Sequence, residues 1–147
     1  MDLYGLWRLL EEAGAAPGES AARIGPDGEV YAEVPADRLL AVVEGLMEAE
    51  GFHHLSAITG QERAEGLEVL YHMWCRGGLT LRVRCPRDGA VLPSLMGLLP
   101  GADWYEREVA EMIGVRFSGR PPLEPLLLPE DWTGPPPLRA KDGGGER

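Results

Sequence analysis

The feature that most constrains the fold of this chain is a proline-dense stretch between residues 121 and 137. Seven of the chain's 13 prolines lie there. Proline lacks a backbone N–H donor and fixes φ, so the stretch can form neither a long helix nor a central strand. It nevertheless carries five large apolar residues: Leu123, Leu126, Leu127, Leu128 and Trp132. Because this apolar surface is unfavourable in water, we expect an extended C-terminal arm (118–140) that packs against its own domain or against a partner protein.

The residues before the arm show a different pattern. The stretch 104–132 reads WYEREVAEMIGVRFSGRPPLEPLLLPEDW. Its first part places charged residues among aromatic and aliphatic residues at helical spacing. We therefore predict a helix over 102–113 that ends at Gly114, followed by a short strand at 115–117.

Periodicity over the rest of the chain predicts an α+β domain. Helices are expected at 2–13, 37–50 and 92–99, and strands at 29–34, 52–59, 67–76 and 79–85, with a polar turn at 60–66. This order favours two layers, in which a small, mainly antiparallel or mixed sheet carries helices on one face. The predicted organisation is an N-terminal helix and linker (1–28), a core (29–117), the arm (118–140) and a disordered tail (141–147).

A Gly77-Gly78 pair between two apolar runs indicates a β-hairpin with a two-residue loop. In that register Trp74 pairs with Leu81 and His72 with Val83. The core face would then hold Leu70, His72, Trp74, Leu79, Leu81, Val83 and Cys85. The opposite face would show Tyr71, Met73, Arg82 and Arg84, which form either a second protein interface or an ordinary solvent face.

Composition excludes several classes of function. A length of 147 residues fits one domain, and a net charge of −10 argues against binding to nucleic acid or to anionic lipid. No apolar run approaches the length of a membrane span, and we expect no secretory signal. Cys75 and Cys85 are too few to hold an iron–sulfur cluster or zinc alone. They fall on opposite predicted faces, so we expect free thiols and a reducing compartment.

No catalytic site and no metal site is predicted. Glu106, Glu108 and Glu111 cluster on the predicted helix, and paired carboxylates can act as acid and base. Glu106 and Glu108 point to different sides of a helix, however, so a salt-bridged or solvated turn is the favoured interpretation. His53 and His54 alternate across a strand and cannot share a metal ion. No phosphate-binding, dinucleotide or nucleophile motif is present.

The pattern W-Y-E-R-E-V-x-x-M-x-G-V-x-F-x-G, followed by L-L-L-P-E-D-W, resembles the signature of a known family. It is the family of the 30 kDa subunit of respiratory complex I (the C subunit of NADH-quinone oxidoreductase), which also supplies a subunit to energy-converting hydrogenases. The likeness is dense over 104–132 and looser over 29–142.

The resemblance implies a compact two-layer domain and a structural role without a cofactor of its own. The complex would carry iron–sulfur clusters and use a quinone, with FMN and NADH in complex I proper. The chain would lie on the cytoplasmic side of the membrane as a peripheral subunit. It would pack on the 49 kDa-type and small iron–sulfur subunits near the quinone site, and support electron transfer coupled to ion translocation. The implied partner-binding residues are Trp104, Glu106, Arg107, Glu108, Gly114, Phe117, Gly119, Pro121, Leu127, Leu128, Pro129, Glu130, Asp131 and Trp132.

The sequence departs from the family pattern just after the signature. Where the family usually has G-H-P-D-L-R-R, residues 119–125 read GRPPLEP, so Arg120 replaces the histidine and Pro122 the aspartate. This difference keeps a subunit of a membrane-bound [NiFe] hydrogenase or ferredoxin-dependent complex as an alternative. A further alternative is a free-standing binding module or hydrolase that uses the Glu106 and Glu108 region.

Overall fold

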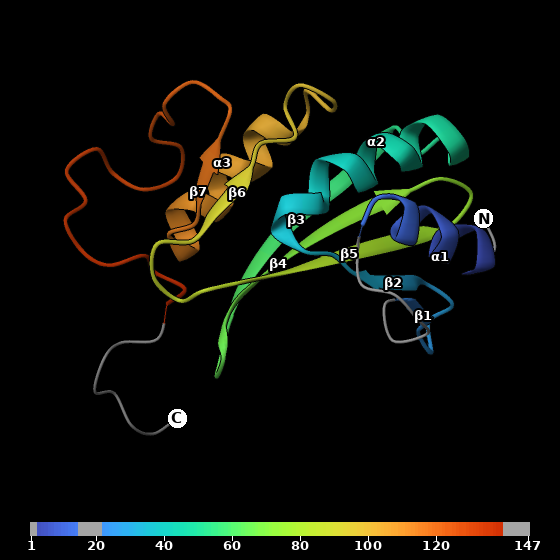
Figure 1. The fold of residues 1–147 in the computed structure, drawn as a ribbon. Coiled ribbons are helices and arrows are strands. Elements are labelled where there is room, and N and C mark those ends of the chain that lie inside the picture. The colour runs from blue at the N-terminus through green and yellow to red at the C-terminus, as the bar shows by residue number, and fades with distance from the viewer. Residues whose placement is uncertain (1–2, 15–21, 140–147) are drawn as a thin grey trace.

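The protein forms two layers, with every described helix on the same side of a sheet (Figure 1). The computed structural model describes residues 3–14 and 22–139. The helices are α1 (Leu3–Glu12), α2 (Leu39–Glu50) and α3 (Ala102–Ile113), with a 3-10 turn, η1 (Ala36–Arg38), leading into α2. This arrangement confirms the predicted α+β class and the placement of the helices on one face.

The main sheet has five strands in the order β1-β2-β5-β4-β3. Its pairs are antiparallel except for β2 with β5, which run parallel, so the sheet is mixed as predicted. A separate parallel pair joins β6 and β7. The strands are β1 (Ala22–Ile24), β2 (Val30–Glu33), β3 (His54–Arg63), β4 (Gly66–Trp74), β5 (Gly78–Cys85), β6 (Val91–Pro93) and β7 (Arg116–Ser118).

A single apolar core fills the space between helices and sheet. From α2 it takes Leu39, Val42, Val43 and Leu46, which are fully buried and recur at three- and four-residue steps. Gly51 then ends α2 with a φ of 75°, a left-handed conformation that glycine adopts without steric cost. The sheet contributes the inward-facing side chains of β4 and β5.

The predicted hairpin register was wrong by an odd number of residues. The loop contains three residues, 75–77, so Trp74 pairs with Gly78, Met73 with Leu79 and Tyr71 with Leu81. Because side chains alternate along a strand, this shift turns β4 over. Tyr71 and Met73 lie in the core, at 0% and 2% exposure, and His72 and Trp74 lie on the other face.

The remaining differences concern the bounds of elements. The stretch predicted as a helix at 92–99 contains β6 and a turn, because Pro93 and Pro100 leave too few donors for a helix. Strand β3 continues through the predicted polar turn as far as Arg63, and β1 lies within the predicted linker. Among the described residues, no helix has both the length and the apolar character that a membrane span requires.

The described part of the C-terminal arm, residues 118–139, contains no helix, and beyond Ser118 no strand. In Figure 1 it leaves β7, runs out in wide loops and returns to the lower end of α3. The predicted tail at 141–147 lies outside the described residues.

Candidate partner-docking surface

Helix α3 has two faces with different contacts, and each follows from residue spacing. One face carries Ala102, Glu106, Val109 and Ile113, all buried against the core. The other carries Trp104, Arg107 and Glu111, which recur at three- and four-residue steps and therefore lie along one side of the helix. The first face fixes the helix on the sheet, and the second holds the arm.

Glu106 is the centre of a buried polar cluster. Its side chain is fully buried, and it accepts hydrogen bonds from the Ser94 hydroxyl (2.7 Å), the Leu95 backbone N–H (2.7 Å) and Arg120 Nη1 (3.0 Å). Arg120 also pairs with Asp103 in the first turn of α3. Burial alone would lower the pKa of the Arg120 guanidinium, but the two carboxylates outweigh burial and raise that pKa. The cluster ties the start of the arm to α3.

Glu111 binds the middle of the arm through backbone groups. Its carboxylate accepts hydrogen bonds from the N–H groups of Leu126 (2.5 Å), Leu127 (2.8 Å) and Leu128 (3.2 Å). Desolvation would raise the pKa of Glu111, but these three donors and the charge of Arg107 lower it below the ordinary glutamate value. A carboxylate held by several N–H groups favours its charged form, so Glu111 anchors the arm as an anion.

Arg107 holds the two arm residues just before Leu126, and it does so as a hydrogen-bond donor. Its guanidinium donates to the carbonyl oxygens of Glu124 (3.4 Å) and Pro125 (3.2 Å). The same guanidinium lies over the Trp104 ring, 5.8 Å from the centroid. Trp104 is therefore held in place by a cation–π contact although its ring is 56% exposed.

The far end of the arm returns to the last turn of α3. The Leu138 N–H donates to the Met112 carbonyl oxygen (2.9 Å), and Arg139 Nη1 donates to the Ile113 carbonyl oxygen (3.2 Å). These bonds satisfy helix carbonyls that would otherwise lack partners. Arg139 also forms an ion pair with Glu62 of β3.

The arm is thus fixed by its backbone, while its large apolar side chains face outward. Exposure is 55% for Leu127, 46% for Trp132 and 60% for Leu138, and 36% for Leu123. Together with Trp104 they form what we call the arm surface: Trp104, Leu123, Leu127, Trp132 and Leu138. Exposed acids lie among them at Glu124, Glu130 and Asp131. Exposed aromatic and aliphatic side chains with charged neighbours are typical of protein interfaces.

The structure sorts the residues implied by the resemblance into two groups. Exposed or partly exposed are Trp104, Arg107, Glu108, Gly114, Gly119, Pro121, Leu127, Leu128, Pro129, Glu130, Asp131 and Trp132. Glu106 and Phe117 are buried, so these two support the surface from beneath and do not present side chains to a partner. Gly114 and Gly119 adopt φ values of 80° and 77° at the two turns that redirect the chain.

Sequence reasoning missed the residues that hold the arm, chiefly Glu111, Arg120 and Arg139. Helical spacing places Glu111 on the same face as Arg107, four residues later, but it does not indicate the backbone groups that Glu111 binds. The hydrolase alternative loses its main residue, because Glu106 is enclosed and bonded to Arg120. Within residues 3–14 and 22–139, no group of three or more His, Cys, Asp and Glu side chains is placed to hold a metal ion.

Comparison with known proteins finds relatives whose descriptions agree with one another. The family model of the "Respiratory-chain NADH dehydrogenase, 30 Kd subunit" matches residues 32–146. The NADH-quinone oxidoreductase C subunit of Moorella thermoacetica is 36% identical over 121 residues, which cover 77% of this chain and 82% of the relative. The F(420)H(2) dehydrogenase C subunit of Methanosarcina mazei is 36% identical over 115 residues, covering 75% of this chain and 73% of the relative.

Solved structures with this fold include the following two. A chain of an archaeal respiratory membrane complex, the membrane-bound sulfane sulfur reductase, superposes with a TM-score of 0.70 at 26% identity, over 84% of this chain and 74% of that chain. A trypsin-resistant fragment (1-134) of Nqo5 superposes with a TM-score of 0.62 at 27% identity, over 79% of this chain and 97% of that chain. The protein therefore belongs to the 30 kDa subunit family of respiratory-chain NADH dehydrogenases, whose members occur in complex I-type quinone oxidoreductases and in related membrane complexes.

Proposed function

We propose that this chain is a cofactor-free structural subunit of a complex I-type NADH-quinone oxidoreductase. Its arm surface packs on the 49 kDa-type subunit, beside the small iron–sulfur subunit and close to the quinone site. The chain supports electron transfer coupled to ion translocation and lies as a peripheral subunit on the cytoplasmic side of the membrane. Iron–sulfur clusters, quinone and any flavin belong to its partners.

The observation that carries the proposal is the contrast between backbone and side chains in the arm. Glu111 and Arg107 hold its backbone on α3, and Trp132 and Leu127 are left about half exposed. A pre-ordered segment loses less conformational entropy on docking than a free one. Exposed aromatic and aliphatic side chains on a fixed backbone supply the anchors that dominate interface energies.

A second candidate is the equivalent subunit of a membrane-bound [NiFe] hydrogenase or ferredoxin-dependent complex. Its support from the comparisons is that one solved relative is a chain of the membrane-bound sulfane sulfur reductase, so the fold also occurs in a respiratory membrane complex of another kind. Arg120 and Pro122, which depart from the usual complex I pattern, also favour it. The partner distinguishes the two candidates: a large subunit with nickel-ligating cysteine pairs identifies a hydrogenase, and one without them supports complex I.

The test compares Trp132→Ala and Leu127→Ala with Tyr4→Ala, which removes a 68% exposed aromatic ring from α1. The tagged chains are purified from gently solubilised membranes, and the co-purifying subunits are identified by mass spectrometry. We expect the two arm variants to lose the large subunit, because truncation of an anchor residue costs about 2 kcal/mol of binding free energy. Their Tm should change little. A large fall in Tm with intact assembly would show that these side chains serve their own domain.

A further inference from the structure

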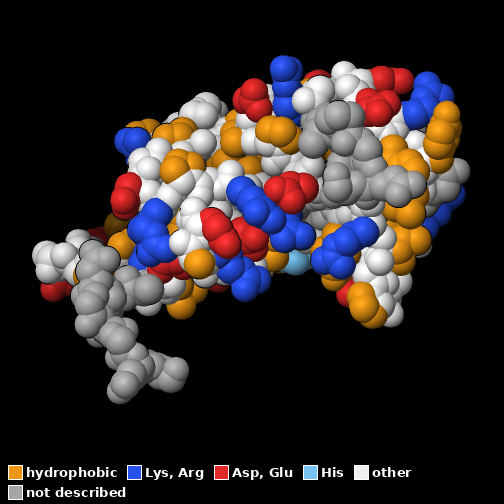
Figure 2. All heavy atoms as spheres, turned by 60° about the horizontal axis from the view of Figure 1, so that its bottom comes forward, with side chains coloured by type: hydrophobic (Ala, Val, Ile, Leu, Met, Phe, Trp, Pro, Cys, Tyr) orange, Lys and Arg blue, Asp and Glu red, His pale blue; other side chains and the backbone are white. Residues whose placement is uncertain are grey.

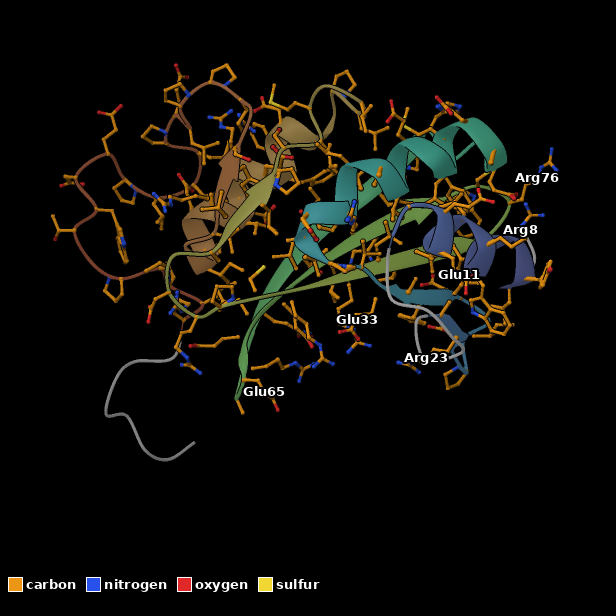
Figure 3. The ribbon with its side chains drawn as sticks, in the orientation of Figure 1. Arg8, Glu11, Arg23, Glu33, Glu65 and Arg76 are labelled. Atoms are coloured by element: carbon orange, nitrogen blue, oxygen red, sulfur yellow. The ribbon has the colours of Figure 1, made fainter. Side chains whose placement is uncertain are left out.

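The second face of the main sheet carries no helix among the described residues. Figure 1 places α1, α2 and α3 on the opposite side, and Figure 3 shows Arg23 and Glu33 pointing away from the helices. By register, this uncovered face also bears Thr59 and Arg63 of β3, alternate residues 68–74 of β4, and Thr80, Arg82 and Arg84 of β5. Figure 2 shows blue and red side chains interleaved across it.

The balance of charge on this face is opposite to that of the chain. Strands β1–β5 place four arginines there, against two glutamates, Glu33 and Glu68. The whole chain has 24 acidic and 14 basic residues. A further glutamate, Glu65, lies at the hairpin turn at one end of the sheet (Figure 3).

Three of these arginines pair with a glutamate, and each is more exposed than the glutamate that it contacts. The Glu68 side chain is only 11% exposed and lies beneath Arg63 and Arg82, with Nε–Oε2 and Nη1–Oε1 distances of 3.4 Å and 3.6 Å. Arg63 and Arg84 are each 57% exposed, and Arg84 Nε lies 2.9 Å from Glu33 Oε1. The two glutamates therefore hold guanidinium groups that stay partly exposed to solvent.

We infer that this uncovered sheet face is a second docking surface, and that its partner is an acidic protein segment of the same assembly. A guanidinium binds a carboxylate through two parallel N–H donors, so fixed arginines favour a partner rich in Asp and Glu. Trp74, which is 54% exposed on this face, supplies an aromatic anchor. The inference rests on membership in an assembly, which the proposed function assumes, and does not depend on the arm surface.

Charge favours a protein partner over lipid or nucleic acid. A membrane or a nucleic acid extends well beyond this face, so its phosphates would also meet the acidic remainder of a chain with a net charge of −10. A short acidic segment can be confined to the local excess of arginine. Arginines and glutamates also lie on neighbouring strands of this face, at the regular spacing of the sheet. Such a fixed pattern of charges suits a protein surface with a matching pattern.

The test reverses the charge of Arg63 and Arg84, which are more exposed than Arg82. R63E/R84E is compared with R8E/R38E, whose arginine side chains are similarly exposed, at 64% and 51%, but lie on α1 and η1. Each pair changes net charge by the same amount. Tagged chains are purified with their complex at increasing NaCl concentrations. We expect R63E/R84E to lower recovery of the complex about tenfold or more, and R8E/R38E to leave it unchanged. Equal recovery would overturn the inference.

A second measurement covers the case in which R63E/R84E fails to fold. The photo-cross-linker p-benzoylphenylalanine replaces Trp74 in the otherwise unchanged chain, with Tyr4 as the control position. In the assembled complex we expect a cross-link from position 74 to a segment with an excess of Asp and Glu. A cross-link to lipid, to a second copy of this chain or to a neutral or basic segment overturns the inference, as does no cross-link. Because Trp132→Ala reports on the arm surface alone, failure there leaves this result unaffected.

Discussion

Arg120 Nη1 lies 3.0 Å from Glu106 Oε2, and both side chains are almost completely removed from solvent, at 5% and 0% exposure. The pair joins the first residues of the arm to the inner face of α3. Glu106→Ala leaves the buried Arg120 with Asp103 as its one remaining carboxylate partner and deprives the Ser94 hydroxyl and the Leu95 N–H of their acceptor. We therefore expect it to lower the free energy of unfolding by about 3–5 kcal/mol. Thermal and denaturant unfolding of the isolated chain measure this.

Glu108→Ala is the matched control, because it removes a partly exposed carboxylate two residues away. We expect a change within about 0.5 kcal/mol there. The double variant E106A/R120A removes both charges and should be less destabilised than the sum of the two single variants. Additive effects would mean that Arg120 and Glu106 are not energetically coupled.

The main elements of this fold could be predicted from sequence, but the hairpin register could not. Periodicity identified α2 and α3 because their apolar stripes coincide with the buried faces. The Gly77-Gly78 pair suggested a two-residue loop, yet the left-handed position of the turn is taken by Arg76, with a φ of 55°. An arginine there gives no sequence signal, because only glycine and asparagine commonly mark this conformation. Because the actual loop is 75–77, the predicted register was shifted by an odd number of residues, and the prediction therefore reversed the two faces of β4.

The candidate site shows the same limit. The resemblance pointed to residues 104–132 as partner-binding, which stays a prediction, and Trp132 and Leu127 are exposed there. It could not show that Glu106 faces inward, because charged residues on an amphipathic helix are normally placed outside. The role of Glu111 depends on three backbone N–H groups 15 to 17 residues away, and backbone partners leave no trace in side-chain identity.

Glu111→Gln should loosen the arm. The amide keeps an oxygen acceptor but loses the charge that strengthens the bonds to Leu126–Leu128. We expect chymotrypsin to cleave at Leu127 and Trp132 about tenfold faster, corresponding to a loss of about 1.4 kcal/mol in local opening free energy. Glu124→Gln makes the same charge change at an exposed arm residue and should leave the cleavage rate unaltered.

Acid should reproduce that loosening in the unmodified chain. The pKa of Glu111 is lower in the folded protein than its ordinary value. The ionised Glu111 therefore contributes fully to stability above the ordinary glutamate pKa, and this contribution is lost as pH falls through the lowered pKa of the folded chain. Hydrogen exchange at the Leu126–Leu128 amides, corrected for intrinsic rates, should show less protection at the acid end. Protection that is equal in E111Q and the unmodified chain at neutral pH would contradict this role.

His72 should make the fold sensitive to mild acid. Its ring bonds Thr59 Oγ1 (3.0 Å) and Thr80 Oγ1 (3.1 Å), and desolvation lowers its pKa, although the charge of Glu29 acts in the opposite direction. Because the histidine pKa is lower in the folded chain than in the unfolded chain, the unfolded chain binds a proton first as pH falls. The free energy of unfolding therefore decreases as pH drops below the ordinary histidine pKa and on through the lowered pKa of the folded chain. His72→Gln removes that component, and the variant should lose less stability than the unmodified chain between pH ~7 and ~5. Denaturant unfolding at several pH values measures the difference, and parallel curves would contradict it.

Gly60 sets how closely α3 approaches the sheet, and so where the arm is held. A Cβ added at Gly60 on β3 would clash with Ile113 Cδ1 and lie 3.3 Å from Val109 Cγ1, both on α3. We expect Gly60→Ala to cost about 1–3 kcal/mol of unfolding free energy through overpacking. Ile113→Val deletes the methyl group that clashes, so G60A/I113V should recover part of that loss although I113V alone is destabilising. Gly97→Ala, at a glycine with no atom within 4 Å of the added Cβ, is the control. A G60A chain as stable as G97A would show that α3 can move away from β3 at little cost, and the arm surface would then lack a fixed base.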